Sequence, residues 1–135
     1  MTNYLLDTDH VIGLIGSDKP IIERMRRSIK TGDRFSICVT TLSELYWFAK
    51  STAQMETNTA ALTELVADLT VLEMDRGAAE IVGELLLEHR SMSLPMPRAV
   101  AEVAAIARQE GLVVLSSDES FRDVRDIQWE DWRGA

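Results

Sequence analysis

Short apolar runs that alternate with helix-patterned segments are the feature that most constrains the fold of this chain. Runs that are too short for a helix and suited to a strand occupy residues 4–6, 35–39, 69–74 and 112–115, and residues 127–132 alternate as an edge strand does. Apolar residues at helical spacing fill the segments 11–15, 20–30, 42–49, 56–67, 78–89 and 98–109. This alternation predicts an α/β fold, with a mostly parallel sheet of four to five strands flanked by helices on both faces.

The size and composition of the chain predict a single domain over residues 1–135. Its 135 residues are a usual domain length, and a hydrophobic content of 46% suffices for a sizeable core. No apolar run approaches the roughly 20 residues that a membrane helix needs, and the acids near the start are foreign to a signal peptide. Cys38 is the only cysteine, which excludes an internal disulfide and a cysteine-based metal cluster. A cytoplasmic location, away from membranes, is therefore the default expectation.

The net charge of −8 argues against broad electrostatic binding of nucleic acid. It is compatible with an acidic metal site, because a bound cation inverts the local charge, and with a basic protein partner. One basic cluster stands out in the acidic chain, and its members are Arg24, Arg26, Arg27 and Lys30. A solvated helix face explains this cluster best, and a contact with the RNA backbone is the alternative.

Acidic residues follow three of the predicted strands. Asp7 comes directly after residues 4–6, Glu44 lies about one turn beyond residues 35–39, and Asp118 follows residues 112–115 closely. In an open α/β sheet, ligands bind outside the carboxyl ends of the strands. Three carboxylates at equivalent ends of neighbouring strands would meet in one cleft and repel one another. Mg²⁺ or Mn²⁺ would relieve this repulsion, and two such ions about 4 Å apart can activate water against a phosphodiester.

Each of these acids also has a purely structural interpretation. Thr8 or Asp9 would serve as the cap of the helix that follows Asp7. The sequence Thr41-Leu-Ser-Glu44 matches a capping box, in which the glutamate returns a hydrogen bond to the cap residue. Taken alone, the capping box is the favoured explanation of Glu44, and only the set of three acids favours a shared site.

The arrangement of these segments resembles the PIN-domain family, in particular the VapC-type toxins of bacterial toxin–antitoxin pairs. The residues that carry the resemblance lie at 5–10, 40–45, 103–107, 111–118 with Phe121, and 127–132, so that nearly the whole chain is covered in order. The resemblance implies a metal-dependent endoribonuclease with Mg²⁺ or Mn²⁺ as the cofactor. Carried over by position, the catalytic metal ligands would be Asp7, Glu44 and Asp118, and the supporting polar residues would be Thr8 and Ser117.

Val100 departs from the family pattern. The family usually has a further aspartate three residues before the position of Val103, and no acid stands at residues 98–101. Glu102 is close in sequence, but two residues turn a helix by roughly 200°, which places it on the opposite face. Loss of one carboxylate should weaken metal binding. A degenerate PIN domain that binds protein or RNA without chemistry is therefore the alternative function.

The resemblance also implies partners: an RNA substrate, a cognate protein antitoxin and a second copy of the chain in a homodimer. Tyr46, Trp47 and Phe48 could form such an interface, although Phe48 is expected in the core and Trp47 fits either place. A receiver-like domain is a third α/β candidate with clustered acids. It would need a lysine near its end, and no lysine occurs after Lys50, which excludes it.

Overall fold

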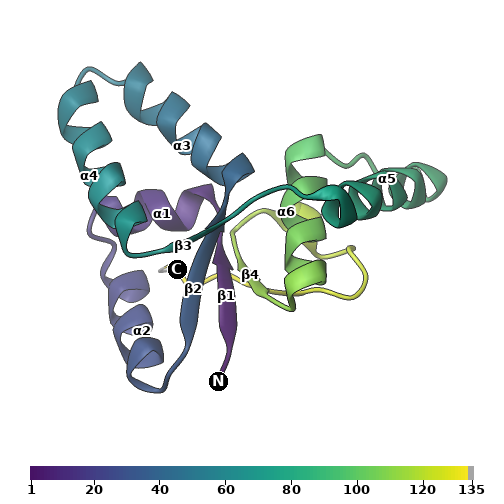
Figure 1. The fold of residues 1–135 in the computed structure, drawn as a ribbon, viewed down its shortest axis with the longest axis horizontal. Coiled ribbons are helices and arrows are strands. Elements are labelled where there is room, and N and C mark those ends of the chain that lie inside the picture. The colour runs from purple at the N-terminus through teal and green to yellow at the C-terminus, as the bar shows by residue number, and fades with distance from the viewer. Residues whose placement is uncertain (134–135) are drawn as a thin grey trace.

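The computed structural model describes residues 1–133. Strands and helices alternate along the chain, as the sequence predicts (Figure 1). Five strands form one sheet: β1 (Asn3–Leu6), β2 (Arg34–Cys38), β3 (Thr70–Leu72), β4 (Val113–Leu115) and β5 (Gln128–Glu130). The helices are α1 (Thr8–Ile15), α2 (Lys19–Lys30), α3 (Val39–Ser51), α4 (Met55–Ala67), α5 (Arg76–Ser91) and α6 (Arg98–Glu110), with a 3₁₀ turn, η1, at Glu119–Phe121.

The strand order is β3-β2-β1-β4-β5, and every pairing in this sheet is parallel. The central strand β1 has β2 on one side and β4 on the other, so the order reverses at β1. Such a reversal leaves a crevice at the carboxyl ends of the neighbouring strands, because the connections that follow them turn to opposite faces. The three strands that precede Asp7, Glu44 and Asp118 are therefore the three neighbours around this crevice.

Two apolar cores lie on the two faces of the sheet. Alternate side chains of each strand point to opposite faces, so Leu5 joins one core while Tyr4 and Leu6 join the other. The core around Leu5 is closed by α5 and α6, and the core around Leu6 is closed by α1, α2, α3 and α4 (Figure 1). The α/β prediction with helices on both faces is confirmed, and the sheet is fully parallel rather than mostly so.

The helix that carries Glu44 begins earlier than the sequence suggests, and the predicted capping box is wrong. Helix α3 starts at Val39 with Cys38 as its N-cap, so Thr41 already lies in the first turn. The Thr41 hydroxyl is buried 3.5 Å from the Cys38 sulfur and does not cap the helix. The β-branched run at 39–41 looks like strand, but pairing with β3 ends at Cys38 and the chain turns into a helix there. Glu44 is thereby released from any capping role.

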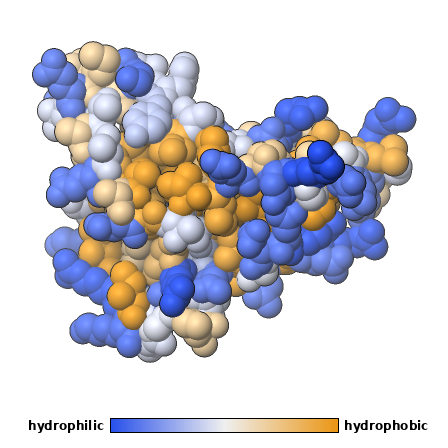
Figure 2. All heavy atoms as spheres, viewed as in Figure 1, coloured by the Kyte–Doolittle hydropathy of each residue, from blue (hydrophilic) through white to orange (hydrophobic). Residues whose placement is uncertain are grey.

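Helix α6 packs against the sheet beside β4, and α5 packs on α6 and projects outward from it (Figure 1). Helix α6 packs through small side chains and is almost wholly buried over residues 100–107. It ends at Gly111, whose φ of 67° is the left-handed conformation that glycine adopts without strain. None of the helices within residues 1–133 is long and apolar enough to cross a membrane. Hydrophilic residues predominate over the projecting α5, while apolar atoms gather in the middle of the same face, around β3 (Figure 2).

Candidate active site

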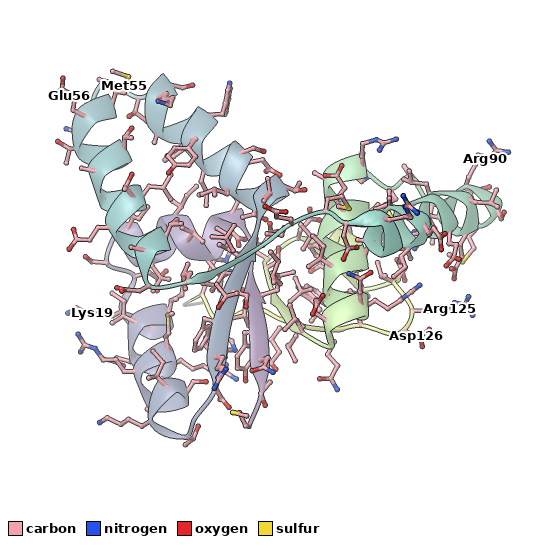
Figure 3. All side chains as sticks on the ribbon, in the orientation of Figure 1. Lys19, Met55, Glu56, Arg90, Arg125 and Asp126 are labelled. Atoms are coloured by element: carbon pink, nitrogen blue, oxygen red, sulfur yellow. The ribbon has the colours of Figure 1, made fainter. Side chains whose placement is uncertain are left out.

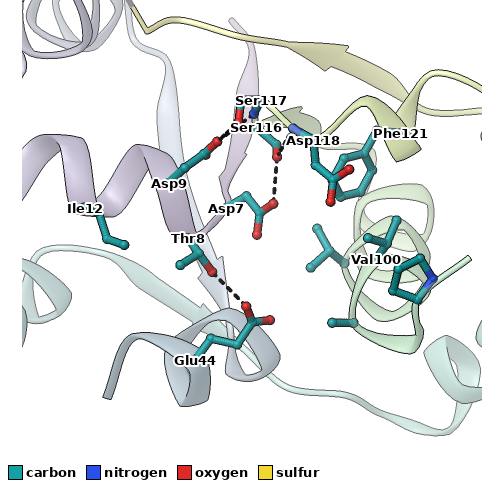
Figure 4. A pocket seen from close by; sticks show the side chains of 13 residues that line it. Asp7, Thr8, Asp9, Ile12, Glu44, Val100, Ser116, Ser117, Asp118 and Phe121 are labelled. Carbon is teal, nitrogen blue, oxygen red and sulfur yellow. Dashed lines mark hydrogen bonds between the residues drawn. The ribbon is translucent and has the colours of Figure 1, made fainter. Parts of the chain in front are cut away.

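A cavity of about 470 Å³ opens at the carboxyl ends of β1 and β4 and beside the start of α3 (Figure 4). Its walls are Asp7, Thr8, Asp9, Ile12, Glu44, Pro97, Ala99, Val100, Val103, Ser116, Ser117, Asp118 and Phe121. All five site residues predicted from the sequence are among them. The carboxylates of Asp7, Glu44 and Asp118 point into the common space from three different segments (Figure 4). The strand order explains this meeting, because β2, β1 and β4 are neighbours.

Asp7 is the innermost of the three acids. Its carboxylate oxygen Oδ2 accepts a hydrogen bond of 2.7 Å from the hydroxyl of Ser116, and its backbone N–H donates to the carbonyl of Leu115. Burial raises the pKa of Asp7, and the nearby charges of Asp9 and Asp118 raise it further, while the bonds from Ser116 and from the N–H of Thr8 partly offset this. An acid with a raised pKa in a crevice is a candidate for cation binding, because a cation would remove the cost of its charge.

Glu44 approaches from the second turn of α3. The hydroxyl of Thr8 donates to its Oε2 across 3.3 Å, which links the start of α1 to α3. The pKa of Glu44 is raised by burial first and by the charge of Asp7 second, with Glu102 adding a smaller effect. Glu102 accepts a hydrogen bond of 2.7 Å from the Thr40 hydroxyl and is absent from the cavity wall. Glu102 thus stays outside the cavity wall, but it does not face away from the site as predicted, because it contacts the first turn of α3 beside Glu44.

Asp118 is held by its own loop. Its Oδ1 accepts the backbone N–H of Ser120 at 2.9 Å, which caps η1, and its backbone N–H donates to the Ser116 hydroxyl at 3.0 Å. The same Ser116 hydroxyl donates to Asp7. One serine therefore fixes the distance between the loop that carries Asp118 and the carboxylate of Asp7. The sequence analysis did not single out Ser116, because a serine after a strand is common and its partner lies 109 positions away.

Asp9 is the second residue whose role the sequence analysis missed. The sequence predicted only that Thr8 or Asp9 caps the helix after Asp7. Its Oδ2 accepts both the backbone N–H (2.9 Å) and the hydroxyl of Ser117, and its Oδ1 accepts the Nδ1–H of His10 at 2.8 Å. Burial opposes ionisation of Asp9, but these hydrogen bonds outweigh it and hold the pKa of Asp9 at about 2. The N-cap position of α1 belongs to Asp7 instead.

Val100 stands on the wall opposite Asp7, with only 7% of its surface exposed (Figure 4). It belongs to the first turn of α6, whose N-cap is Pro97 and whose first turn carries no acid. The side of α6 that faces the carboxylates is thus apolar, formed by Ala99, Val100 and Val103. The cavity combines an acidic wall from α1, α3 and the β4 loop with an apolar wall from α6.

The donor chemistry of the cavity fits a hard cation that keeps part of its water shell. Within residues 1–133, no three His, Cys, Asp or Glu side chains lie close enough together to enclose an ion by themselves. Mg²⁺ is commonly bound through one or two carboxylates, several waters and the phosphates of a substrate, so it does not need a closed protein cage. Asp7, with Glu44 and Asp118 on either side, supplies oxygen donors of this kind, and the other polar side chains of the wall are the hydroxyls of Thr8, Ser116 and Ser117 and the carboxylate of Asp9.

The reversal of strand order and the carboxylate crevice together define an α/β protein with an acidic site at the carboxyl ends of its strands. The chain belongs to the PIN-domain family, whose family model matches residues 4–127.

Relatives over the full length of the chain are VapC proteins. The tRNA(fMet)-specific endonuclease VapC of Salmonella typhimurium is 31% identical and that of Shigella flexneri 29%, each over 98% of this chain and 99% of its own length. The crystal structure of DNA-bound VapBC from Salmonella typhimurium superposes with a TM-score of 0.88 at 29% identity, covering 98% of this chain and 99% of the matched chain. Among PIN domains, this chain is therefore of the VapC type.

Proposed function

We propose that this protein is a divalent-metal-dependent endoribonuclease that cleaves RNA phosphodiesters in the cavity at the end of β1. The observation that carries the proposal is the convergence of Asp7, Glu44 and Asp118 on one space at the point where the strand order reverses. The full-length relatives support it, since they are named as endonucleases that act on RNA.

Asp7, Glu44 and Asp118 would hold Mg²⁺ or Mn²⁺, and when bound the metal would supply an activated water and stabilisation of the leaving oxygen. The residues of the chain prepare the site for this. Ser116 fixes the Asp7 carboxylate through its hydroxyl, and Thr8 fixes Glu44 in the same way. The apolar wall formed by Val100 and its neighbours limits the water around the carboxylates, which strengthens their interaction with a cation.

Electrostatic attraction over the whole surface contributes little to RNA binding in this proposal. The net charge is −8, and Arg24 of the basic cluster is engaged by Glu130 at 3.1 Å and stacks over Trp132. Lys19, Arg90 and Arg125 point outward on the flanks of the molecule (Figure 3). Recognition of RNA would thus depend on the metal site itself and on the walls of the cavity.

A protein antitoxin is the proposed partner, because the 29% identical Salmonella typhimurium relative was solved as a VapBC complex. A homodimer is proposed on the family resemblance alone. The chain offers exposed aromatic side chains on α3 for such contacts: Trp47 is 73% exposed and Phe48 is 40% exposed. The expectation that Phe48 lies in the core is wrong, since it covers only the rim of a small apolar groove between α1, α3 and α4.

The test is cleavage of a mixed RNA substrate by the purified protein in Mg²⁺, in Mn²⁺ and in a chelator. We expect metal-dependent cutting that is lost in Asp7→Asn, which keeps the side-chain shape and removes the charge. Asp68→Asn is the matched control, because Asp68 is exposed at the end of α4 and the substitution removes the same charge away from the cavity. Absence of cutting in both metals by the folded wild-type protein would overturn the proposal.

A second candidate function is a PIN domain that has lost catalysis and acts through binding alone. Val100, buried in the wall where the family usually has an aspartate, is the observation that favours it. Mn²⁺ occupancy of the cavity discriminates the two candidates. The nuclease proposal predicts that Mn²⁺ binds at the Asp7 carboxylate. The binding-only candidate predicts that Mn²⁺ does not bind there.

A further inference from the structure

We infer that Asp9, held in place by His10, is a positioning residue that orients the loop carrying Asp118 toward Asp7. This inference deepens the proposed function, on which it rests in taking that loop as part of the active site. Asp9 itself turns away from the middle of the cavity toward Ser117 (Figure 4). Its role is therefore to hold the loop rather than to contact the substrate.

The loop of residues 116–118 has few other restraints on the side of α1. Asp9 receives two hydrogen bonds from Ser117, one from its backbone N–H and one from its hydroxyl. A carboxylate that accepts a backbone N–H and an adjacent hydroxyl through one oxygen fixes both the position and the rotation of that residue. Because Ser117 directly precedes Asp118, this contact sets the direction in which Asp118 leaves the strand.

His10 determines which way the Asp9 carboxylate faces. The imidazole has no exposed surface, and its Nδ1–H donates to Oδ1 of Asp9 across 2.8 Å. Its Nε2 accepts the backbone N–H of Trp132 at 2.9 Å, which assigns the ring proton to Nδ1. With Oδ1 engaged by His10, the other oxygen of Asp9 is presented to Ser117.

The far end of this chain of hydrogen bonds is rigid. The Trp132 ring is 4% exposed and packs edge-on against Tyr4 and Phe35, with ring centroids 4.8 Å and 5.9 Å apart. The C-terminal segment is thus tied through His10 and Asp9 to the loop after β4. The same loop is also bound to β5, since the indole N–H of Trp129 donates to the Ser116 carbonyl at 2.7 Å. That indole is a natural reporter of loop position.

Two substitutions of His10 separate positioning from simple stabilisation. In His10→Asn the side-chain amide lies where Nδ1 lies and can still donate to Asp9, while the bond to Trp132 is lost. In His10→Gln the amide oxygen lies where Nε2 lies and can still accept from Trp132, while the bond to Asp9 is lost. Both variants remove a buried ring and one hydrogen bond, so their costs in stability should be similar. Val11→Ala, an apolar loss at the next buried position of α1, is a further control.

The experiment compares Asp9→Asn, His10→Gln, His10→Asn and Val11→Ala with the wild type by three measurements. These are the thermal midpoint, the indole N–H resonance of Trp129 in a ¹⁵N–¹H spectrum, and Mn²⁺ affinity by electron paramagnetic resonance of the free ion. The chain has three tryptophans, so single Trp→Phe variants assign the indole signals. Trp47, which is 73% exposed on α3, serves as the internal reference.

We expect Asp9→Asn and His10→Gln to shift the Trp129 resonance and to weaken Mn²⁺ binding by about tenfold or more, as loss of a group that orients a ligand does. His10→Asn and Val11→Ala should lower the thermal midpoint and leave both other readouts at wild-type values. The inference is overturned if Asp9→Asn and His10→Gln lose stability without moving either readout. If the wild type binds no Mn²⁺, the proposed function fails, while the Trp129 resonance still decides whether Asp9 positions the loop.

Should a His10 variant not fold, Ser117→Ala removes the hydroxyl bond to Asp9 at a partly exposed position and must shift the Trp129 resonance in the same direction.

Discussion

At the scale of single residues, Val100 decides how much negative charge the cavity holds. The acidic wall carries Asp7, Glu44 and Asp118, whereas the wall formed by α6 is apolar where the family usually has an aspartate. Burial raises the pKa of Asp7 and of Glu44, and the charges of the neighbouring carboxylates raise both further. Compared with an aspartate, a valine here reduces the repulsion among carboxylates in the metal-free cavity and gives a cation one ligand fewer.

Val100→Asp should therefore reverse this balance. We expect Mn²⁺ affinity to rise by about tenfold or more, equivalent to about 1.4 kcal/mol, and RNA cleavage to rise with it. The same substitution should lower the thermal midpoint in chelator, because a further carboxylate joins Asp7 and Glu44. Val100→Asn, similar in shape and uncharged, is the control and should show neither gain. Unchanged Mn²⁺ affinity in Val100→Asp, measured by titration of the folded protein, would mean that this wall does not face the metal.

At the scale of elements, helix α5 depends on the residue that caps its start, Asp75, and on its neighbour α6. Asp75 caps α5 by accepting the backbone N–H of Ala78 at 2.9 Å, and it also accepts the side-chain amide of Gln109 from α6. These hydrogen bonds lower the pKa of Asp75. One side chain thus connects the start of α5 with the end of the helix that forms the apolar wall of the cavity.

Loss of this cap should be measurable as loss of stability. Asp75→Ala should lower the thermal midpoint followed by circular dichroism, whereas Asp75→Asn, which can still cap, should lower it much less. Because the folded pKa of Asp75 is depressed, its charge stabilises the fold above the ordinary aspartate range, and this contribution fades as the pH falls below that range. The difference in thermal midpoint between the wild type and Asp75→Asn should accordingly become smaller in acid. A difference that widens in acid would contradict the assigned role.

The elements differ in how far the sequence predicts them. The strands of the sheet were predictable because a buried parallel strand is apolar on both faces, and residues 112–115 and 4–6 show this directly. The start of α3 was not, because β-branched residues at 39–41 favour a strand until the sheet edge ends it. The pairs Asp9–Ser117 and Asp7–Ser116 join residues more than 100 positions apart, so no local pattern could reveal them. Asp7, Glu44 and Asp118 were identified because strand ends are local features.

At the scale of the whole molecule, the carboxylates that the proposed function needs lower the stability of the fold. Buried or clustered carboxylates lower the stability of the metal-free fold, and a site kept ready for a cation carries this cost until the cation binds. The rest of the molecule compensates through two apolar cores, one on each face of the sheet. A ligand that binds only the folded state would add stability in proportion to its concentration over its dissociation constant, so metal should raise the thermal midpoint.

Removing the central charge should consequently stabilise the metal-free protein. Burial raises the folded pKa of Asp7 above its unfolded value, so the folded state is favoured while Asp7 is protonated and loses this advantage as the pH rises through the raised pKa. Asp7→Asn does not ionise, so it does not lose this stability as the pH rises, and its amide oxygen can still accept the hydrogen bond from Ser116. In chelator at near-neutral pH, its thermal midpoint should exceed that of wild type by a few degrees, and the two should converge in acid. Added Mn²⁺ should raise the wild-type midpoint and leave Asp7→Asn unchanged. Asp68→Asn should behave as wild type in both series, and a metal-free Asp7→Asn less stable than wild type at near-neutral pH would show that Asp7 is held for the fold rather than for a cation.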